Sequence, residues 1–344
     1  MNKRLATSEG LEMLSTGNIL ELGQAANNLR QQMHPGNTVT FVIDRNINYT
    51  NICTSACRFC AFYRPVGHAE GYVLPEALIF EKLQETIAAG GTQVMLQGGL
   101  NPSLGLDYYI NLLQFIKRNF DIVIHSFSPA EILHIANKEG LSVVDTLAKL
   151  KAAGLDSLPG GGAEILVDAV RQRVSPNKIS AADWLSVMEA AHHVGLESTA
   201  TMVIGMGETY AQRMEHMEKV RTLQEKTGGF RAFIIWSYQP GNTQLGGEKI
   251  SAWDYLKTLA VARLYFNNIK HIQGSWVTQG QNIGQLTLAF GANDLGSIML
   301  EENVVRAAGT SYQMSIEKML ELIRATGNAP AQRDTQYNII KTFE

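Results

Sequence analysis

The sequence has little cysteine, little charge and no long apolar run. Only 3 of its 344 residues are cysteine, an odd number and too few for a disulfide framework. Charged residues make up 18% of the chain and the formal net charge is −3, which argues against a nucleic-acid binder because such proteins usually carry a basic excess. No apolar run approaches the roughly 18–20 residues that span a bilayer, and the first residues lack the apolar stretch of a secretory signal. We therefore expect a cytoplasmic protein that binds neither nucleic acid nor membrane.

The three cysteines, in contrast, stand together at Cys53, Cys57 and Cys60. No other part of the sequence contains the residue, so the clustering indicates that the thiols act as a group. A C-x3-C-x2-C spacing fits zinc, an iron–sulfur cluster or three small buried side chains. Structural zinc needs four protein ligands, and only His68 lies close in sequence. A [4Fe–4S] cluster with three thiolates leaves one iron for a small molecule. The spacing favours the cluster and leaves the other two readings open.

Short β-branched runs alternate with longer amphipathic segments, which is typical of repeated β/α units. Eight strands are predicted, at Thr38–Asp44, Thr92–Gln97, Ile122–Ser126, Leu155–Pro159, Glu197–Ile204, Phe230–Trp236, His271–Val277 and Leu288–Asn293. Eight strands alternating with helices predict a (β/α)8 barrel of the TIM type. We place this α/β barrel over residues 38–309, with an N-terminal helical extension over 1–37 and a C-terminal helical extension over 310–344.

Polar and glycine-rich segments follow each of the eight predicted strands. In a barrel of this kind, the active site lies at the carboxyl ends of the strands. A single glycine indicates little, because tight turns need positive φ with or without a ligand. Eight such segments on one rim nevertheless predict one shared active site.

The segment Cys53-x3-Cys57-x-Phe59-Cys60, directly after the first strand, resembles the signature of the radical S-adenosylmethionine superfamily. The resemblance implies that the three cysteines ligate a [4Fe–4S] cluster whose open iron chelates the methionine part of S-adenosylmethionine. An electron from the reduced cluster then releases a 5′-deoxyadenosyl radical. The resemblance also implies a low-potential electron donor such as flavodoxin or ferredoxin. Phe59 matches the aromatic position that contacts the adenine, and a packing role for its ring is compatible with that contact.

Other positions of the superfamily match in part. It often has Gly-Gly-Glu after the second strand, where backbone groups meet the methionine ammonium, whereas here Gly98 and Gly99 are followed by Leu100. A common element after the fifth strand keeps its last glycine and its carboxylate, Gly205 and Glu208. The cofactor-binding candidates are therefore Phe59, Gln97, Gly98, Gly99, Ser128 and Glu164, the last of which could equally cap a helix.

Longer segments resemble the radical enzymes of the menaquinone futalosine pathway and of deazaflavin-cofactor synthesis. They are Asp44–Asn51, Cys60–Arg64 and Pro159–Ile165. Within that group, further segments resemble the cyclic dehypoxanthine futalosine synthases, namely Gly91–Pro102, Ser275–Gly280, Gly291–Asp294 and Glu301–Val305. The resemblance extends from about residue 38 to residue 309. Aminofutalosine synthase, or a related deazaflavin-cofactor radical enzyme, is the alternative.

The resemblance implies an oxidative ring closure of dehypoxanthine futalosine. The deoxyadenosyl radical takes a hydrogen from the ribose C4′, and the carbon radical attacks a nearby ring of the same molecule. Joining two C–H positions removes two hydrogens, one of which leaves in 5′-deoxyadenosine and the other as a proton and an electron. The proton needs a base, for which the candidates are Asp294, Glu302, Glu208 and Glu164. Asp294 is the first choice because we expect it to follow the last strand; an Asx turn or helix cap is its structural alternative.

Overall fold

The computed structural model describes residues 4–343. Its strands are β1 (Thr38–Val42), β2 (Asp44–Ile47), β3 (Gln93–Leu96), β4 (Val123–Ile124), β5 (Ser198–Ile204), β6 (Phe230–Ser237), β7 (His271–Gln273), β8 (Asp294–Ser297), β9 (Ala329–Arg333) and β10 (Ile339–Thr342). Its helices are α1 (Thr7–Thr16), α2 (Ile19–Met33), α3 (Glu76–Ala88), α4 (Leu106–Asn119), α5 (Pro129–Glu139), α6 (Val143–Ala153), α7 (Asp168–Val174), α8 (Ala181–His193), α9 (Tyr210–Thr227), α10 (Ala252–Tyr265), α11 (Trp276–Gln279), α12 (Gln281–Leu286), α13 (Val304–Ala307) and α14 (Ile316–Arg324), with a 3₁₀ turn, η1 (Thr287–Ala289).

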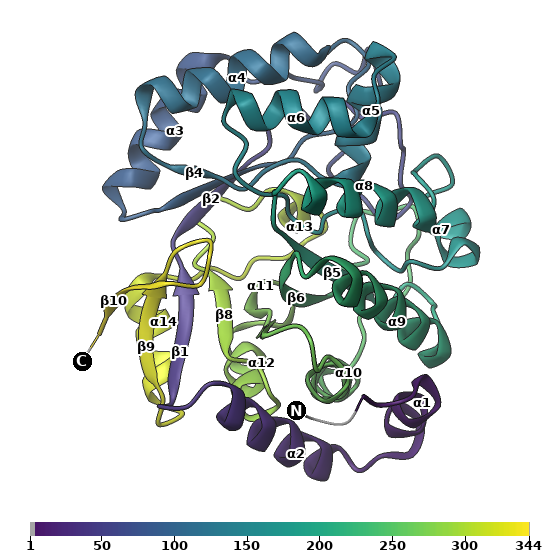
Figure 1. Cartoon of the computed structure of the whole chain (residues 1–344), viewed down its shortest axis with the longest axis vertical. Coiled ribbons are helices and arrows are strands. Elements are labelled where there is room, and N and C mark those ends of the chain that lie inside the picture. Colours follow the sequence, from purple (N-terminus) through teal and green to yellow (C-terminus); the bar gives the residue numbers. More distant parts are fainter. Residues whose placement is uncertain (1–3, 344) are drawn as a thin grey trace.

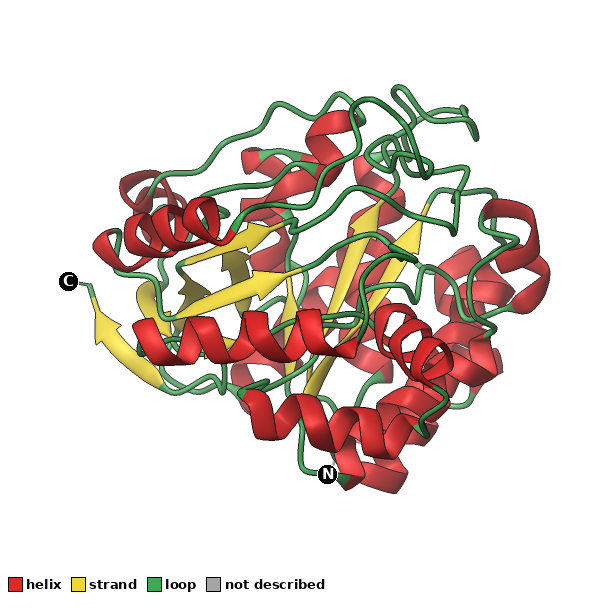
Figure 2. Cartoon of the chain, turned by 90° about the horizontal axis from the view of Figure 1, so that it is seen from above, coloured by secondary structure: helices red, strands yellow, loops and turns green. Residues whose placement is uncertain are grey.

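Parallel strands surround a central axis, and most helices lie outside them (Figures 1 and 2). β1 and β2 are two halves of one run interrupted at Ile43; β1 pairs with β8 and β2 pairs with β3. The other gap is closed by two single parallel bridges, His125–Ser157 and Leu158–Ser198, which link β4 through the predicted fourth strand to β5. Eight strand positions thus complete the circle, and the predicted (β/α)8 fold class is confirmed.

Two predicted strands differ from the structure near the end of the barrel. The seventh ends at Gln273, because the Ser275 N–H donates to the Tyr255 hydroxyl (2.8 Å) and the chain turns into α11. The eighth strand occupies Asp294–Ser297, after the predicted segment rather than within it. The first two residues of the predicted segment, Leu288 and Ala289, instead belong to η1, which continues α12, and Phe290–Asn293 form the turn that leads into β8; short apolar runs are ambiguous between helix and strand. Asp294 therefore opens the last strand and does not follow it, which corrects the prediction.

The C-terminal extension contains the expected helix α14, but it also contains two strands that the sequence analysis did not predict. β9 runs parallel to β1, and β10 pairs antiparallel with β9 (Figure 1). The C-terminal extension also contacts residues at and just before the start of β3. Gln332 donates to the Gly90 carbonyl (2.8 Å), and Thr335 donates to the Gln93 side-chain oxygen (2.6 Å). The extension therefore contributes to the barrel wall between its first and second strands.

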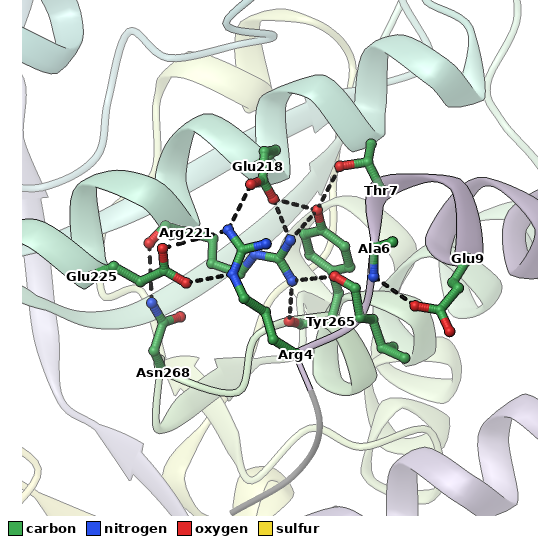
Figure 3. A network of polar contacts seen from close by, with 10 residues as sticks. Arg4, Ala6, Thr7, Glu9, Glu218, Arg221, Glu225, Tyr265 and Asn268 are labelled. Carbon is green, nitrogen blue, oxygen red and sulfur yellow. Dashed lines mark hydrogen bonds and ion pairs between the residues drawn. The ribbon is translucent and has the colours of Figure 1, made fainter.

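The N-terminal helices pack on the outside of the barrel. α1 contacts α9 and α10, and α2 contacts α10. A Cβ added to Gly10 in α1 would lie 2.3 Å from Met214 Cε of α9, so the glycine lets the Met214 side chain pack against α1 in its present position. In front of α1, Arg4 forms ion pairs with Glu218 (2.7 Å) and Glu225 (2.8 Å) of α9 (Figure 3). The N-terminal segment is thus held to the barrel by packing and by charge.

Candidate active site

A cavity of ≈ 400 Å³ lies inside the barrel and reaches from the cysteine loop to the C-terminal strands. Cys53, Cys57 and Cys60 line it together. Arg333, at the end of β9, and Tyr337, after it, line the same cavity. The predicted active-site rim is therefore continuous with a cavity whose wall includes the C-terminal extension.

The loop from Cys53 to Cys60 is held in place by backbone hydrogen bonds. The Cys53 N–H donates to the Arg64 carbonyl (3.0 Å), and the Cys60 N–H donates to the Cys57 carbonyl (3.1 Å). Arg64 in turn donates to the carbonyls of Ala61, Phe62 and Tyr63 (3.2, 3.3 and 3.0 Å). A guanidinium that binds three successive carbonyls fixes the chain just after the last cysteine, so the three thiols are presented by an ordered loop.

The surroundings of the three thiols fit ligation of an iron–sulfur cluster, in which positively charged iron replaces the thiol protons. Burial raises the pKa of Cys57 to about 12 and also raises that of Cys60. Cys53 Sγ accepts a hydrogen bond from the Leu100 N–H (3.3 Å), as cluster-ligating thiolates commonly do. Within residues 4–343, no three His, Cys, Asp or Glu side chains are arranged to hold a single metal ion. Soft thiolate ligands are the type that iron–sulfur clusters take.

The two glycines after β3 approach the cysteine loop closely. A Cβ on Gly99 would lie 2.2 Å from the Ile52 carbonyl oxygen and 2.7 Å from Cys53 Cβ. A Cβ on Gly98 would lie 2.4 Å from Cζ of the Tyr49 ring. The absence of a side chain at Gly99 therefore lets the segment after β3 pack against the cysteine loop. A side chain at Gly98 would collide with the Tyr49 ring.

The six predicted cofactor-binding residues all line the cavity: Phe59, Gln97, Gly98, Gly99, Ser128 and Glu164. Glu164 is buried and paired with Lys178 (2.8 Å) and Arg171 (3.4 Å). The Lys178 ammonium also lies 5.6 Å from the centre of the Phe59 ring. The structure thus brings these side chains together on one wall, while the contact of each with a cofactor stays a prediction.

The sequence analysis missed Glu131, a buried carboxylate beside the glycine turn. Its two oxygens accept the N–H groups of Gly98 (3.0 Å) and Ser128 (2.7 Å) and the Tyr49 hydroxyl (2.6 Å). Burial raises the pKa of Glu131, against the effect of these hydrogen bonds. Ser128 and Glu131 form the capping box of α5, so the S-x-x-E spacing was a signal that could have identified Glu131.

Of the four predicted bases, Asp294 and Glu208 do not line the cavity. Asp294 is buried and ion-paired through both oxygens with Arg333 (2.5 and 3.1 Å), and it also accepts the Thr40 hydroxyl (2.6 Å). Glu208 accepts two N–H groups of the turn that precedes it and pairs with Arg213 (2.9 Å). Both carboxylates bind groups of the fold outside the cavity lining, and their role as the base stays a prediction.

Glu302 does line the cavity, but its carboxylate is engaged by the backbone. It accepts the N–H groups of Val304, Val305 and Arg306 (3.1, 2.9 and 3.3 Å) at the start of α13. Burial raises the pKa of Glu302. A further cavity carboxylate, Asp44, was not among the predicted bases although it stands inside a segment that the sequence analysis singled out.

Comparisons with known proteins agree with this geometry. Residues 47–220 match the family model described as the radical SAM superfamily, and residues 227–344 match the model for the CofH/MqnC C-terminal region. The crystal structure of methylornithine synthase (PylB) shares the fold with a TM-score of 0.74, at 21% identity over 96% of this chain and 95% of that one. The hydrogenase maturase HydG from Carboxydothermus hydrogenoformans gives a TM-score of 0.77 at 15% identity, over 97% and 78% of the two chains. The chain belongs to the radical S-adenosylmethionine superfamily and is a radical enzyme.

Two groups of curated relatives place the chain more narrowly. It is 49% identical to the cyclic dehypoxanthine futalosine synthase of Halalkalibacterium halodurans, over 99% of this chain and 93% of that protein. The synthase of Streptomyces coelicolor is 44% identical, over 97% and 85%. The 5-amino-6-(D-ribitylamino)uracil–L-tyrosine 4-hydroxyphenyl transferase of Archaeoglobus fulgidus is 41% identical, over 94% of each chain. The chain thus belongs to the family that unites these synthases and transferases, which implies a [4Fe–4S] cluster and S-adenosylmethionine. Among residues 4–343, no helix has the length and apolar character to cross a membrane.

Proposed function

We propose that this enzyme oxidatively cyclises dehypoxanthine futalosine to cyclic dehypoxanthine futalosine, a step of menaquinone biosynthesis, beginning with hydrogen abstraction at the ribose C4′. The observation that carries the proposal is the 49% identity with the H. halodurans synthase along nearly the whole chain. A low-potential flavodoxin or ferredoxin is the proposed electron donor.

When bound, the cluster and S-adenosylmethionine supply a one-electron cleavage that generates the hydrogen-abstracting radical. Cys53, Cys57 and Cys60 would hold the cluster from the loop after β2. The buried Glu131 carboxylate holds the Gly98 N–H and so orients the turn that faces this loop. The walls of the cavity enclose the reacting groups, which protects a radical from side reactions with water.

The transfer reaction of the archaeal relatives is the second candidate. It is favoured by the 41% identity with the A. fulgidus protein over 94% of both chains. The two reactions leave different products, because cyclisation removes two hydrogens from one substrate whereas a transfer joins a group to a second molecule.

The test is anaerobic turnover of the reconstituted enzyme with S-adenosylmethionine, a reductant and dehypoxanthine futalosine. We expect a product two hydrogens lighter than the substrate and one 5′-deoxyadenosine for each product molecule. Parallel reactions contain 5-amino-6-(D-ribitylamino)uracil and tyrosine. Formation of their coupled product, with no loss of two hydrogens from dehypoxanthine futalosine, would replace the cyclase proposal by the transferase.

A further inference from the structure

The cavity has a floor, which residues 333–337 of the C-terminal extension help to form. Thr335 donates to the side chain of Gln93 (2.6 Å), the first residue of β3. The Tyr337 ring stacks on His271, the first residue of β7, with the ring centres 3.7 Å apart. The segment therefore crosses the end of the barrel where the strands begin, whereas the cysteine loop follows the other end of β2.

Arg231 brings a buried cation to this floor through a β-bulge in β6. Ser198 and Thr199 of β5 are consecutive, but their partners in β6 lie two residues apart, so Arg231 is an extra residue in that strand. Bulges redirect side chains and are frequent next to active sites. Arg231 lines the cavity, and its side chain is only 9% exposed.

The contacts of the Arg231 guanidinium are long. Nη1 lies 3.7 Å from Oε2 of Glu197, whose side chain is 52% exposed, and such an ion pair contributes little. Nη2 lies 3.5 Å from His125 Nδ1, and the enclosed Nε has no partner within residues 4–343. Burial lowers the pKa of Arg231. A buried cation is costly unless an anion is brought close to it.

The acidic groups on this side of the cavity do not supply that anion. Asp294 is ion-paired with Arg333 through both oxygens (2.5 and 3.1 Å). Burial raises the pKa of Asp44 and so favours its neutral form. Arg231 is therefore the cation of the floor that lacks a close carboxylate among the described residues.

His125 and Tyr337 add hydrogen-bond donors to the floor, and both line the cavity. His125 Nδ1 faces Arg231, which can only donate, so the neutral ring carries its proton on Nε2. Burial, assisted by Arg231, lowers the pKa of His125 well below its usual value and keeps the ring neutral. Within residues 4–343, neither His125 Nε2 nor the Tyr337 hydroxyl has a hydrogen-bond partner.

We infer that this floor binds a carboxylate of the substrate, at the end of the molecule away from the reacting ribose, a role that rests on the proposed function. Arg231 supplies the opposite charge, and His125 Nε2–H and the Tyr337 hydroxyl donate to the carboxylate oxygens. Charged hydrogen bonds of this kind are stronger than neutral ones. Because the ribose must lie near the cysteine loop, an anchor at the other end of the cavity positions it for hydrogen abstraction.

The test measures equilibrium binding of dehypoxanthine futalosine to the oxidised, cluster-loaded enzyme with S-adenosylmethionine, a state that does not turn over. Arg231→Gln should raise the Kd of the substrate at least about 10-fold, because a charged hydrogen-bond donor is lost. Its iron content and its Kd for S-adenosylmethionine should stay at the wild-type values. The matched control is Glu197→Gln, which removes the exposed partner of Arg231 and should not weaken substrate binding.

A second arm changes the ligand instead of the protein, using the analogue of dehypoxanthine futalosine whose carboxylic acid is a primary carboxamide. Wild-type enzyme should bind this amide at least about 10-fold more weakly than the acid. Arg231→Gln should bind acid and amide nearly equally, because the interacting pair is already broken.

An unchanged Kd in Arg231→Gln, or a preference for the acid that survives in this variant, would overturn the site. If Arg231→Gln fails to fold or to load iron, the wild-type comparison decides alone, and equal affinity for acid and amide overturns the inference. Wild-type enzyme that neither binds nor cyclises dehypoxanthine futalosine refutes the proposed function instead, and the carboxylate site falls with it.

Discussion

At the scale of single residues, Gly98 and Gly99, which follow β3, show how the absence of a side chain shapes the site. Gly99 touches the backbone just before Cys53, and Gly98 lies against Tyr49. The superfamily pattern identified both glycines from the sequence. It did not identify the carboxylate that accepts the Gly98 N–H, because Glu131 comes from α5, a part of the chain that only the fold brings near.

Replacing Gly99 by alanine should displace the cysteine loop, since the new Cβ would lie 2.2 Å from a backbone oxygen that has little room to move. We expect Gly99→Ala to bind less than half of the wild-type iron after anaerobic reconstitution, measured as iron and sulfide per chain. Gly105→Ala, in the same connection between β3 and α4, meets only the movable Glu139 side chain and should load normally. Full iron in Gly99→Ala would show that the loop tolerates the shift.

Cys57 is the most buried of the three thiols. With only three protein ligands available for the cluster, Cys57→Ala should lose the iron–sulfur absorption and all cleavage of S-adenosylmethionine, which is measured as 5′-deoxyadenosine or methionine released. Ser55→Ala, in the same loop, removes no cluster ligand and should keep the absorption. Cleavage by Cys57→Ala at the wild-type rate would contradict the ligand set.

Among the elements, helices were easier to predict than the strands of the last third of the barrel. Helix α8, for example, begins after Ser180, whose side chain accepts the Asp183 N–H, and such capping residues act locally. The run Leu288–Asn293 has no such local signal, and burial on all sides suits a helix and a strand equally. The strands β9 and β10 have no clear alternation and depend on pairing with β1, which sequence alone does not show. The mispredicted eighth strand placed Asp294 at the active-site rim, whereas in the structure it begins β8 and does not line the cavity.

Glu131 takes part in the N-terminal capping box of α5 and also accepts the N–H of Gly98, a predicted cofactor-binding residue. In Glu131→Gln the side-chain N–H groups face the donors of Gly98 and Ser128, so at least one hydrogen bond is lost, at a cost of about 1–3 kcal/mol. We expect a lower Tm and a higher KM for S-adenosylmethionine. Asp183→Asn changes the equivalent residue in the exposed capping box of α8 and should alter stability by less and leave KM unchanged. An unchanged KM in Glu131→Gln would restrict Glu131 to the helix.

At the scale of the whole molecule, the N-terminal segment is fastened to the barrel by a polar network on α9 and α10 (Figure 3). Glu218 accepts from Arg4, Arg221 and Tyr265, and the buried Arg221 guanidinium lies 3.6 Å from the centre of the Tyr265 ring. Burial alone would raise the pKa of Glu218, but the donors outweigh it and lower the pKa.

A carboxyl whose pKa is lowered by folding stabilises the protein above its unfolded pKa and loses that effect as the pH falls through the folded pKa. The Tm of Glu218→Gln should therefore lie below that of wild type at pH 7, and the difference should shrink on acidification. Melting curves of both proteins between about pH 7 and pH 3 measure this. Glu215→Gln, on the same helix and paired only with Lys219 at the surface, should show almost no difference, and a gap for Glu218→Gln that widens in acid would contradict the assignment.

The wall that Arg333 and Tyr337 add to the cavity also has a consequence for biosynthesis. A ribosome makes the cysteine loop early, whereas these two residues emerge only after nearly all of the barrel has left the exit tunnel. Until then the interior is open on the side where β9 will lie next to β1, and any iron inserted into the nascent chain would be accessible to oxygen. The order of translation therefore favours maturation of the metallocentre after β9 has paired with β1 and these two residues line the cavity.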